Sequence, residues 1–157
     1  MKTAKTNAAR LLDRAGVDYR LVSYRVDERD LGAIHLANEL GEPPGRIFKT
    51  LALSGDKTGH FVCCLPGDLE VDLKKAAKAS GNKSASLLPL KKLQAATGYV
   101  RGGCSPLAMK KRFPTFIHQS AEQFPAIYVS AGLRGLQILI DPRALAAVAG
   151  AVFADLA

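Results

Sequence analysis

The sequence predicts an α+β fold in which a mixed, largely antiparallel and partly curled sheet is flanked by helices. Two observations lead to this class. Helical and strand-like segments interleave along the 157 residues without a regular βαβ repeat. Glycine and proline are spread singly along the chain, where they separate one segment from the next. The sequence contains no repeat, low-complexity tract or linker. The length suits one core, so we expect a single domain over residues 1–157.

Five segments have the apolar periodicity of helices, with a capping residue or a proline near the start and a glycine near the end. In one of them Asp72 can cap the first turn, and Leu73, Ala76 and Ala77 are expected to face inward while the lysines face solvent. The predicted helices are residues 6–15, 32–40, 72–80, 89–97 and 142–149.

Seven shorter segments have the alternating or wholly apolar pattern of strands. Ser54, Gly55 and Asp56 separate the second from the third and predict a hairpin. Val152 and Phe153 are expected to pack near the end of the chain. The predicted strands are residues 19–24, 47–53, 60–65, 84–87, 115–118, 126–130 and 136–140.

Positive charge is the main compositional signal. Lys and Arg number 22 against 14 Asp and Glu, which gives a net charge of +8 at pH 7. This balance favours an anionic partner, nucleic acid first, although a basic soluble protein without such a partner has the same charge. Clustering of the cations favours nucleic acid without saying which one. The clusters are Lys74, Lys75 and Lys78; Lys91 and Lys92; and Lys110, Lys111 and Arg112.

Several classes of protein do not fit the composition. Apolar residues make up 48% and charged residues 23%, as in soluble globular proteins, and no apolar run approaches a membrane span. The start of the chain lacks the apolar centre of a signal peptide, so we expect a cytoplasmic protein. Cys63 and Cys64 lie in an apolar run and are expected to be free buried thiols. Neither the cysteines nor the histidines have the spacing of metal ligands.

Lys49 is the first candidate for a functional side chain. It lies in the apolar strand IFKTLAL and shares a face with Ile47, Leu51 and Leu53. A lysine on such a face must reach solvent, pair with an acid or line a cavity, although a lysine that protects a sheet edge fits the pattern too. In a cavity, its ammonium could hold a phosphate, a ribose oxygen or a developing oxyanion.

Two glycine-rich segments suggest a ligand pocket. In the first, Gly102 and Gly103 precede Cys104, Ser105 and Pro106, and their N–H groups could bind an anion or simply form a turn. No Cys-His pattern supports Cys104 as a nucleophile.

The second segment runs from residue 130 to 135. Ser130 is expected to donate a hydrogen bond, because no triad accompanies it. Arg134 either pairs with phosphate or clamps the turn. Tyr24 is either strand core or a hydroxyl in the pocket.

At these residues the chain resembles the YbaK/EbsC family of free-standing editing proteins, which are related to the editing insertion of bacterial prolyl-tRNA synthetases. The match runs from the first helix to the terminal FADLA. Its motifs are F-K-T at 48–50, L-K-K-A-A-K at 73–78, T-G-Y-V-x-G-G-x-S-P-L at 97–107, K-K-R at 110–112 and Y-V-S-x-G-x-R-G-L at 128–136. The resemblance implies an α+β fold with a mixed sheet around a pocket.

The resemblance also implies an activity, the cleavage of cysteine from mischarged Cys-tRNA(Pro) and from Cys-tRNA(Cys). In this family the substrate's own thiol attacks its carbonyl and releases a cyclic thioester, so no protein nucleophile, metal or cofactor is expected. The expected partners are aminoacyl-tRNA and, in a transient complex, prolyl-tRNA synthetase. The candidate catalytic residues are Lys49, Gly102 and Ser130; the candidate substrate-binding residues are Tyr24, Thr50, Gly103, Ser105, Gly132 and Arg134.

The chain departs from the family pattern at two places. Gln137 stands where some members carry an acid, and Leu31 or Gly32 stands where an aromatic pocket residue is expected. Two alternatives therefore stay open. One is an editing deacylase for another small amino acid, such as that of Ala-tRNA(Pro), which uses water. The other is a tRNA-binding or synthetase-binding module without catalysis.

Overall fold

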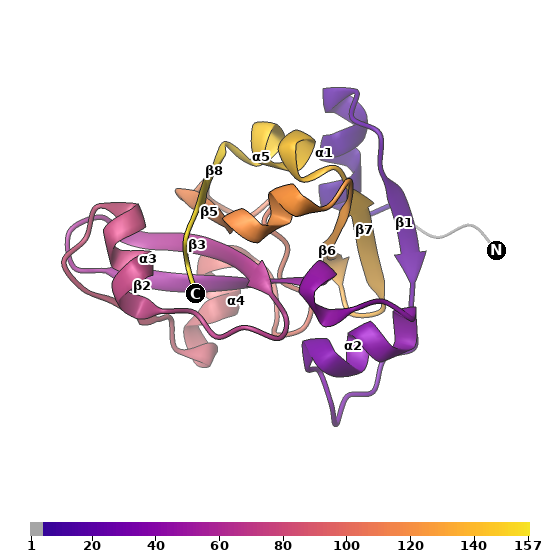
Figure 1. Cartoon of the computed structure of the whole chain (residues 1–157), viewed down its shortest axis with the longest axis horizontal. Coiled ribbons are helices and arrows are strands. Elements are labelled where there is room, and N and C mark those ends of the chain that lie inside the picture. Colours follow the sequence, from indigo (N-terminus) through magenta and orange to yellow (C-terminus); the bar gives the residue numbers. More distant parts are fainter. Residues whose placement is uncertain (1–4) are drawn as a thin grey trace.

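The computed structural model describes residues 5–157 as helices packed on two sheets (Figure 1). Every predicted helix is confirmed, and each ends at a glycine in the left-handed conformation. Leu73 remains 40% exposed, so the inward face of its helix begins one turn later than predicted. The helices are α1 (Asn7–Ala15), α2 (Ala33–Leu40), α3 (Leu73–Ser80), α4 (Leu90–Thr97) and α5 (Pro142–Ala149), with short 3₁₀ helices at Pro44–Arg46 and Gln119–Gln123.

The strands form one antiparallel sheet of order β1-β7-β6 and one mixed sheet of order β4-β2-β3-β5-β8. In the mixed sheet, β4-β2-β3 is antiparallel, whereas β3-β5 and β5-β8 are parallel. The predicted α+β class is therefore confirmed, with the strands divided between two sheets. The strands are β1 (Arg20–Ser23), β2 (Phe48–Gly55), β3 (Gly59–Pro66), β4 (Ala85–Leu87), β5 (Thr115–His118), β6 (Ile127–Leu133), β7 (Leu136–Ile140) and β8 (Ala151–Ala154).

Local signals account for the hairpin but not for the last strand. The β2-β3 hairpin forms as predicted, and Gly55 pairs with Gly59 at its tip. No strand is predicted at β8, where Val152 stays 59% exposed. This strand exists because β5 offers it a parallel edge, a contact between distant parts of the sequence.

One contact between the sheets positions the functional site. The main core cluster contains Phe48 and Cys64 of the mixed sheet together with Val129 and Ile138 of the antiparallel sheet. At the entrance to β2, Ile47 forms a parallel bridge with Tyr128 of β6. The first residues of β2 therefore run beside the middle of β6.

Candidate functional site

A cavity of about 730 Å³ lies where the two sheets meet. Its volume falls in the range of sites that enclose a small-molecule ligand. Four of the candidate residues line it, namely Lys49, Thr50, Gly102 and Ser130. The full lining consists of residues 30–36, 38, 47–52, 67, 70, 87, 88, 90, 93, 101, 102, 104, 130 and 137.

The bridge between the sheets brings Lys49 and Ser130 together. Each lies two residues beyond a member of the Ile47–Tyr128 pair, so both are carried into the same wall of the cavity. Among residues 5–157, the Lys49 ammonium has no carboxylate within ion-pair distance and no hydrogen-bond acceptor. The cavity thus contains a cation that no group among the described residues neutralises.

Ser130 is arranged as a hydrogen-bond donor. Its side chain is buried, and its Oγ accepts a hydrogen bond from the N–H of Gly132 at 3.1 Å. That bond uses one lone pair of the oxygen and leaves the hydroxyl hydrogen for another acceptor. Within the described part of the chain no histidine or carboxylate bonds to Ser130, so nothing there activates it as a nucleophile.

Gly102 lies in a turn that Arg134 holds in place. The φ of Gly102 is +84°, a conformation that side chains disfavour. Arg134 donates from its Nε to the carbonyl oxygen of Arg101 at 2.8 Å, so it clamps this turn. The N–H of Gly103 donates to Val100 within the turn and is not free to bind an anion. Gly102 instead reaches the cavity wall.

The other five candidate residues do not line the cavity. Tyr24 continues the β1-β7 pairing through a backbone bond to Gly135, and Ser105 is fully buried with its Oγ bonded to the N–H of Leu107. Gly132 packs against Tyr99, and Gly103 packs against the backbone of Leu133 and Arg134. These contacts shape the loops that carry Gly102 and Ser130.

Two polar side chains in the cavity were not assigned a role by the sequence motifs. Gln137 is 2% exposed and lies opposite Ser130 across the β6-β7 pair. Its Oε1 and the Nε2 of His35 are buried without a hydrogen-bond partner among the described residues. The glutamine has a sequence signal, a polar residue inside the apolar strand LQILI. His35 has no such signal, because nothing in the sequence around it distinguishes it from a surface histidine.

The cysteines are free and buried, as predicted. Cys104 lines the cavity, and burial raises the pKa of its thiol to about 11. Burial likewise raises the pKa values of Cys63 and Cys64 to about 12. Thr50 reaches toward Cys64, with its Oγ1 3.6 Å from the Sγ. These environments disfavour the thiolate that a nucleophile requires.

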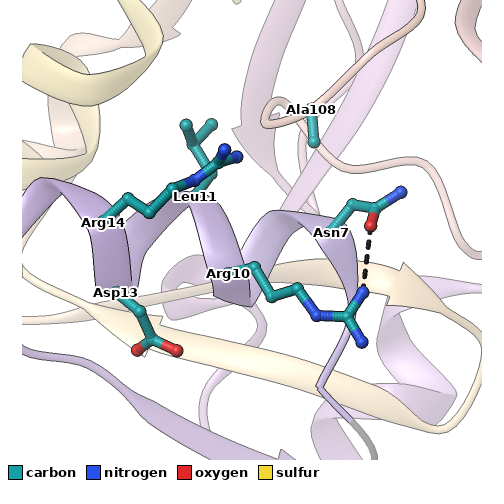
Figure 2. A pocket seen from close by; sticks show the side chains of 6 residues that line it. All are labelled: Asn7, Arg10, Leu11, Asp13, Arg14 and Ala108. Atoms are coloured by element: carbon teal, nitrogen blue, oxygen red, sulfur yellow. Dashed lines mark hydrogen bonds between the residues drawn. The ribbon is translucent and has the colours of Figure 1, made fainter.

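A second hollow of about 560 Å³ is lined by residues of α1 and by Ala108 of a loop (Figure 2). It shares no lining residue with the first cavity. Arg10 donates to the Oδ1 of Asn7 at 3.2 Å, and Arg14 and Ala108 lie nearby. The Asp13 carboxylate accepts hydrogen bonds from Lys5 and Tyr19, and these bonds hold the pKa of the carboxyl below its usual value. None of the candidate residues lines this hollow, whereas four of them line the larger cavity, which is therefore the candidate site.

Comparison of the sequence with known protein families identifies the family. Residues 32–148 match the family described as the aminoacyl-tRNA editing domain. The chain belongs to this family. The chain is 49% identical over 152 residues to EbsC of Enterococcus faecalis, which carries the provisional name Cys-tRNA(Pro)/Cys-tRNA(Cys) deacylase. The alignment covers 97% of this chain and 93% of EbsC.

Solved structures of low sequence identity share the fold of this editing domain. One is provisionally described as a trans-editing enzyme for prolyl-tRNA synthetase, with a TM-score of 0.82, 23% identity and 98% coverage of both chains. Another, the hypothetical protein APE2540, has a TM-score of 0.85 and 23% identity over 94% of this chain and 96% of that one.

Two further features bear on the class of protein. Within residues 5–157, no helix combines the length and the apolar character that crossing a membrane requires. The same residues hold no group of three His, Cys, Asp or Glu side chains arranged to bind a metal ion.

Proposed function

We propose that this protein is a trans-editing deacylase that removes cysteine from mischarged Cys-tRNA(Pro), with Cys-tRNA(Cys) as a second substrate. The observation that carries the proposal is the convergence of Lys49, Gly102 and Ser130 from three distant segments on one cavity. The family membership and the 49% identity to EbsC support the substrate class.

The residues of the cavity suit the cleavage of an ester that is already reactive. An aminoacyl ester needs positioning and stabilisation of a developing oxyanion more than it needs a protein nucleophile. We assign the positioning and stabilisation of the ester to the Lys49 ammonium, the Gly102 N–H and the Ser130 hydroxyl, because all three residues line the cavity. Within residues 5–157 no base is bonded to Ser130, which fits a reaction in which the substrate supplies its own nucleophile.

The proposed step is an intramolecular transfer of the acyl group. The cysteine thiol loses its proton, and its sulfur forms a bond to the ester carbonyl carbon. The bond from that carbon to the ribose oxygen then breaks, and the proton passes to that oxygen. The products are a cyclic thioester and tRNA with a free terminal hydroxyl. Nothing is oxidised or reduced, and no co-reactant is consumed.

The direct test is release of radiolabelled cysteine from Cys-tRNA(Pro) by the full chain. Release above the uncatalysed rate supports the proposal. Binding of tRNA that weakens steeply with salt, without cleavage, would instead favour a non-catalytic module that binds tRNA or a synthetase.

Three further aspects belong to this proposal. Residues 1–157 form one editing domain, and it acts in the cytoplasm, where aminoacyl-tRNA is made. It works in a transient complex with prolyl-tRNA synthetase. The reason for a partner is that lysine and arginine contacts to phosphates carry no sequence information and cannot identify tRNA(Pro) by themselves.

Replacement of Gln137 by leucine is expected to raise the KM for Cys-tRNA(Pro) about tenfold and to change kcat less than about threefold. The buried Oε1 of Gln137 has no partner in residues 5–157, and the substrate's α-ammonium is a donor of matching chemistry. A hydrogen bond to a charged group contributes about 1.5–3 kcal/mol, and the lower end of this range corresponds to about a tenfold change in KM. Steady-state kinetics measure both constants.

A matched variant, Gln137→Glu, keeps an acceptor at the same position and is expected to retain a KM near that of the wild type. An unchanged KM in Gln137→Leu would show that the amide does not contact the substrate.

Replacement of Cys104 by alanine is expected to leave deacylation within about threefold of the wild-type rate. Its thiol has a pKa of about 11, so roughly one molecule in 10⁴ carries a thiolate at pH 7. The initial rate of cysteine release, with and without iodoacetamide treatment of the enzyme, provides the measurement. A loss of two orders of magnitude would assign catalysis to this thiol.

A further inference from the structure

Cations from two distant segments of the chain meet at the hollow beside α1 (Figure 2). Arg10 and Arg14 line the hollow from α1, and both are exposed. Ala108 lines it from a loop that continues into the exposed basic run at 110–112. Since Lys110 is two residues beyond Ala108, its backbone lies within about 7 Å of that lining residue. The hollow is therefore bordered by positive charge on both elements.

The described residues leave these charges largely unneutralised. Among residues 5–157, neither the two arginines of α1 nor the three cations at 110–112 have a carboxylate within ion-pair distance. Arg10 donates to the neutral amide of Asn7. Asp13 also lines the hollow, but Lys5 pairs with its carboxylate at 2.6 Å. A concave surface with charges of one sign focuses the electrostatic field and attracts polyanions.

The basic loop is held in place by the elements beside it. The N–H of Lys110 donates to the carbonyl oxygen of Thr97 at 3.1 Å, and the stem of the lysine lies against Gly98, which ends α4. The guanidinium of Arg112 lies against Gly150, which ends α5. A ligand of the hollow thus meets cations whose backbone is already positioned, which lowers the entropic cost of binding.

The other two lysine clusters lack this arrangement. The lysines at 74–78 lie on the single helix α3, and Lys75 pairs with Asp155 at 3.0 Å. The lysines at 91–92 are neighbours on the single helix α4. None of them lines the hollow or the cavity that contains Lys49. The hollow beside α1 is the place where basic residues of separate elements surround a concavity.

The hollow is close enough to that cavity to contact the same nucleic-acid strand. Gly102 lines the cavity and Ala108 lines the hollow, and both belong to one loop. The six residues from one to the other span at most about 22 Å when fully extended. This length equals about six nucleotides of a double helix, at roughly 3.4 Å of axis each, and fewer of an extended strand.

We propose that the hollow beside α1 binds the phosphate backbone of the tRNA acceptor end, a few nucleotides away from the ester in the cavity. This inference rests on the proposed function, because it takes the end of an aminoacyl-tRNA to be the ligand of the cavity. Phosphate contacts fix the position of a strand without reading its sequence. The hollow therefore positions any tRNA end and leaves the choice of amino acid to the cavity.

The test is binding of the full chain to a fluorescein-labelled, uncharged RNA minihelix that contains the acceptor stem and single-stranded end of tRNA(Pro). Fluorescence anisotropy at roughly 50 to 200 mM NaCl gives the Kd and its salt dependence. Arg10→Ala/Arg14→Ala and Lys110→Ala/Lys111→Ala are each expected to raise the Kd at least about fivefold at the lowest salt. Each should also reduce the slope of log Kd against log salt by about one to two, because each removes two phosphate contacts.

Steady-state kinetics provide a second readout of the same variants. Their KM for Cys-tRNA(Pro) should rise by at least about fivefold, and their kcat should stay within about twofold of the wild-type value. The reason is that contacts far from the ester bind the substrate and the transition state equally.

The matched control is Lys74→Ala/Lys78→Ala, which removes the same charge from the exposed face of α3. It is expected to change the Kd less than about twofold. Wild-type affinity in both hollow variants would overturn the inference. An equal loss in the control would overturn it too, because charge anywhere on the surface would then suffice. Hollow variants that keep RNA affinity but lose association with prolyl-tRNA synthetase would assign the hollow to a protein partner instead.

The outcomes also separate this inference from the proposed function. RNA binding that depends on the hollow, without any release of cysteine, would overturn the deacylase and support the hollow. Release of cysteine with the same KM in both hollow variants would overturn the hollow alone.

Discussion

Replacement of Lys49 by alanine is expected to lower the rate of cysteine release from Cys-tRNA(Pro) by about 10²–10³-fold, the usual effect of removing one oxyanion donor. Among residues 5–157, Lys49 has no ion-pair or hydrogen-bond partner, and it lines the cavity beside Ser130. Its positive charge is therefore available to the negative charge that develops on the ester carbonyl oxygen. Single-turnover kinetics with saturating enzyme measure the chemical step.

The controls for this prediction separate catalysis from folding and from general charge. Because the Lys49 ammonium bonds to no group among residues 5–157, its removal should leave the thermal unfolding midpoint unchanged or slightly higher. Lys57→Ala changes an exposed lysine in the β2-β3 turn, removes the same net charge and should keep the wild-type rate. Full activity of Lys49→Ala would remove this cavity as the site of deacylation.

Cleavage of Cys-tRNA(Pro) is expected to exceed cleavage of Ala-tRNA(Pro) by at least about two orders of magnitude. An attacking group within the substrate replaces a bimolecular encounter with water, and well-oriented intramolecular attack has a large effective concentration. Proline has no thiol, so the same rule protects correctly charged Pro-tRNA(Pro). The measurement is release of labelled amino acid from the three substrates side by side.

A substrate analogue makes the comparison sharper. S-Methylcysteinyl-tRNA(Pro) keeps the sulfur but has no thiol to ionise, and it should resist cleavage as the alanyl ester does. Preference for the alanyl ester would assign the protein to the editing enzymes that use water. That result would also give a role to Leu31 and Gly32, which line the cavity where relatives are expected to carry an aromatic residue.

The sequence by itself determined the local structure and the unusual residues. Capping residues and terminal glycines located the helices, and alternation together with the turn at residues 54–56 located the hairpin. Lys49 could be selected as a functional candidate because a lysine in an apolar strand must reach solvent, pair with an acid or line a cavity. These features depend on residues that are close in the sequence, and such interactions leave a periodic or compositional pattern.

The tertiary structure decided which of those residues meet. The Ile47–Tyr128 bridge places Lys49 beside Ser130, and the pairing of β4 with β2 puts Leu87 into the same cavity. Within a single motif, Gly102 reaches the cavity while Gly103 bonds inside the turn. Arg134 clamps that turn through Arg101, an alternative that the sequence had left open. Some of these contacts join residues that are far apart in the sequence, and others depend on where a single N–H or side chain points. The pattern of apolar and polar residues along a sequence contains neither kind of information.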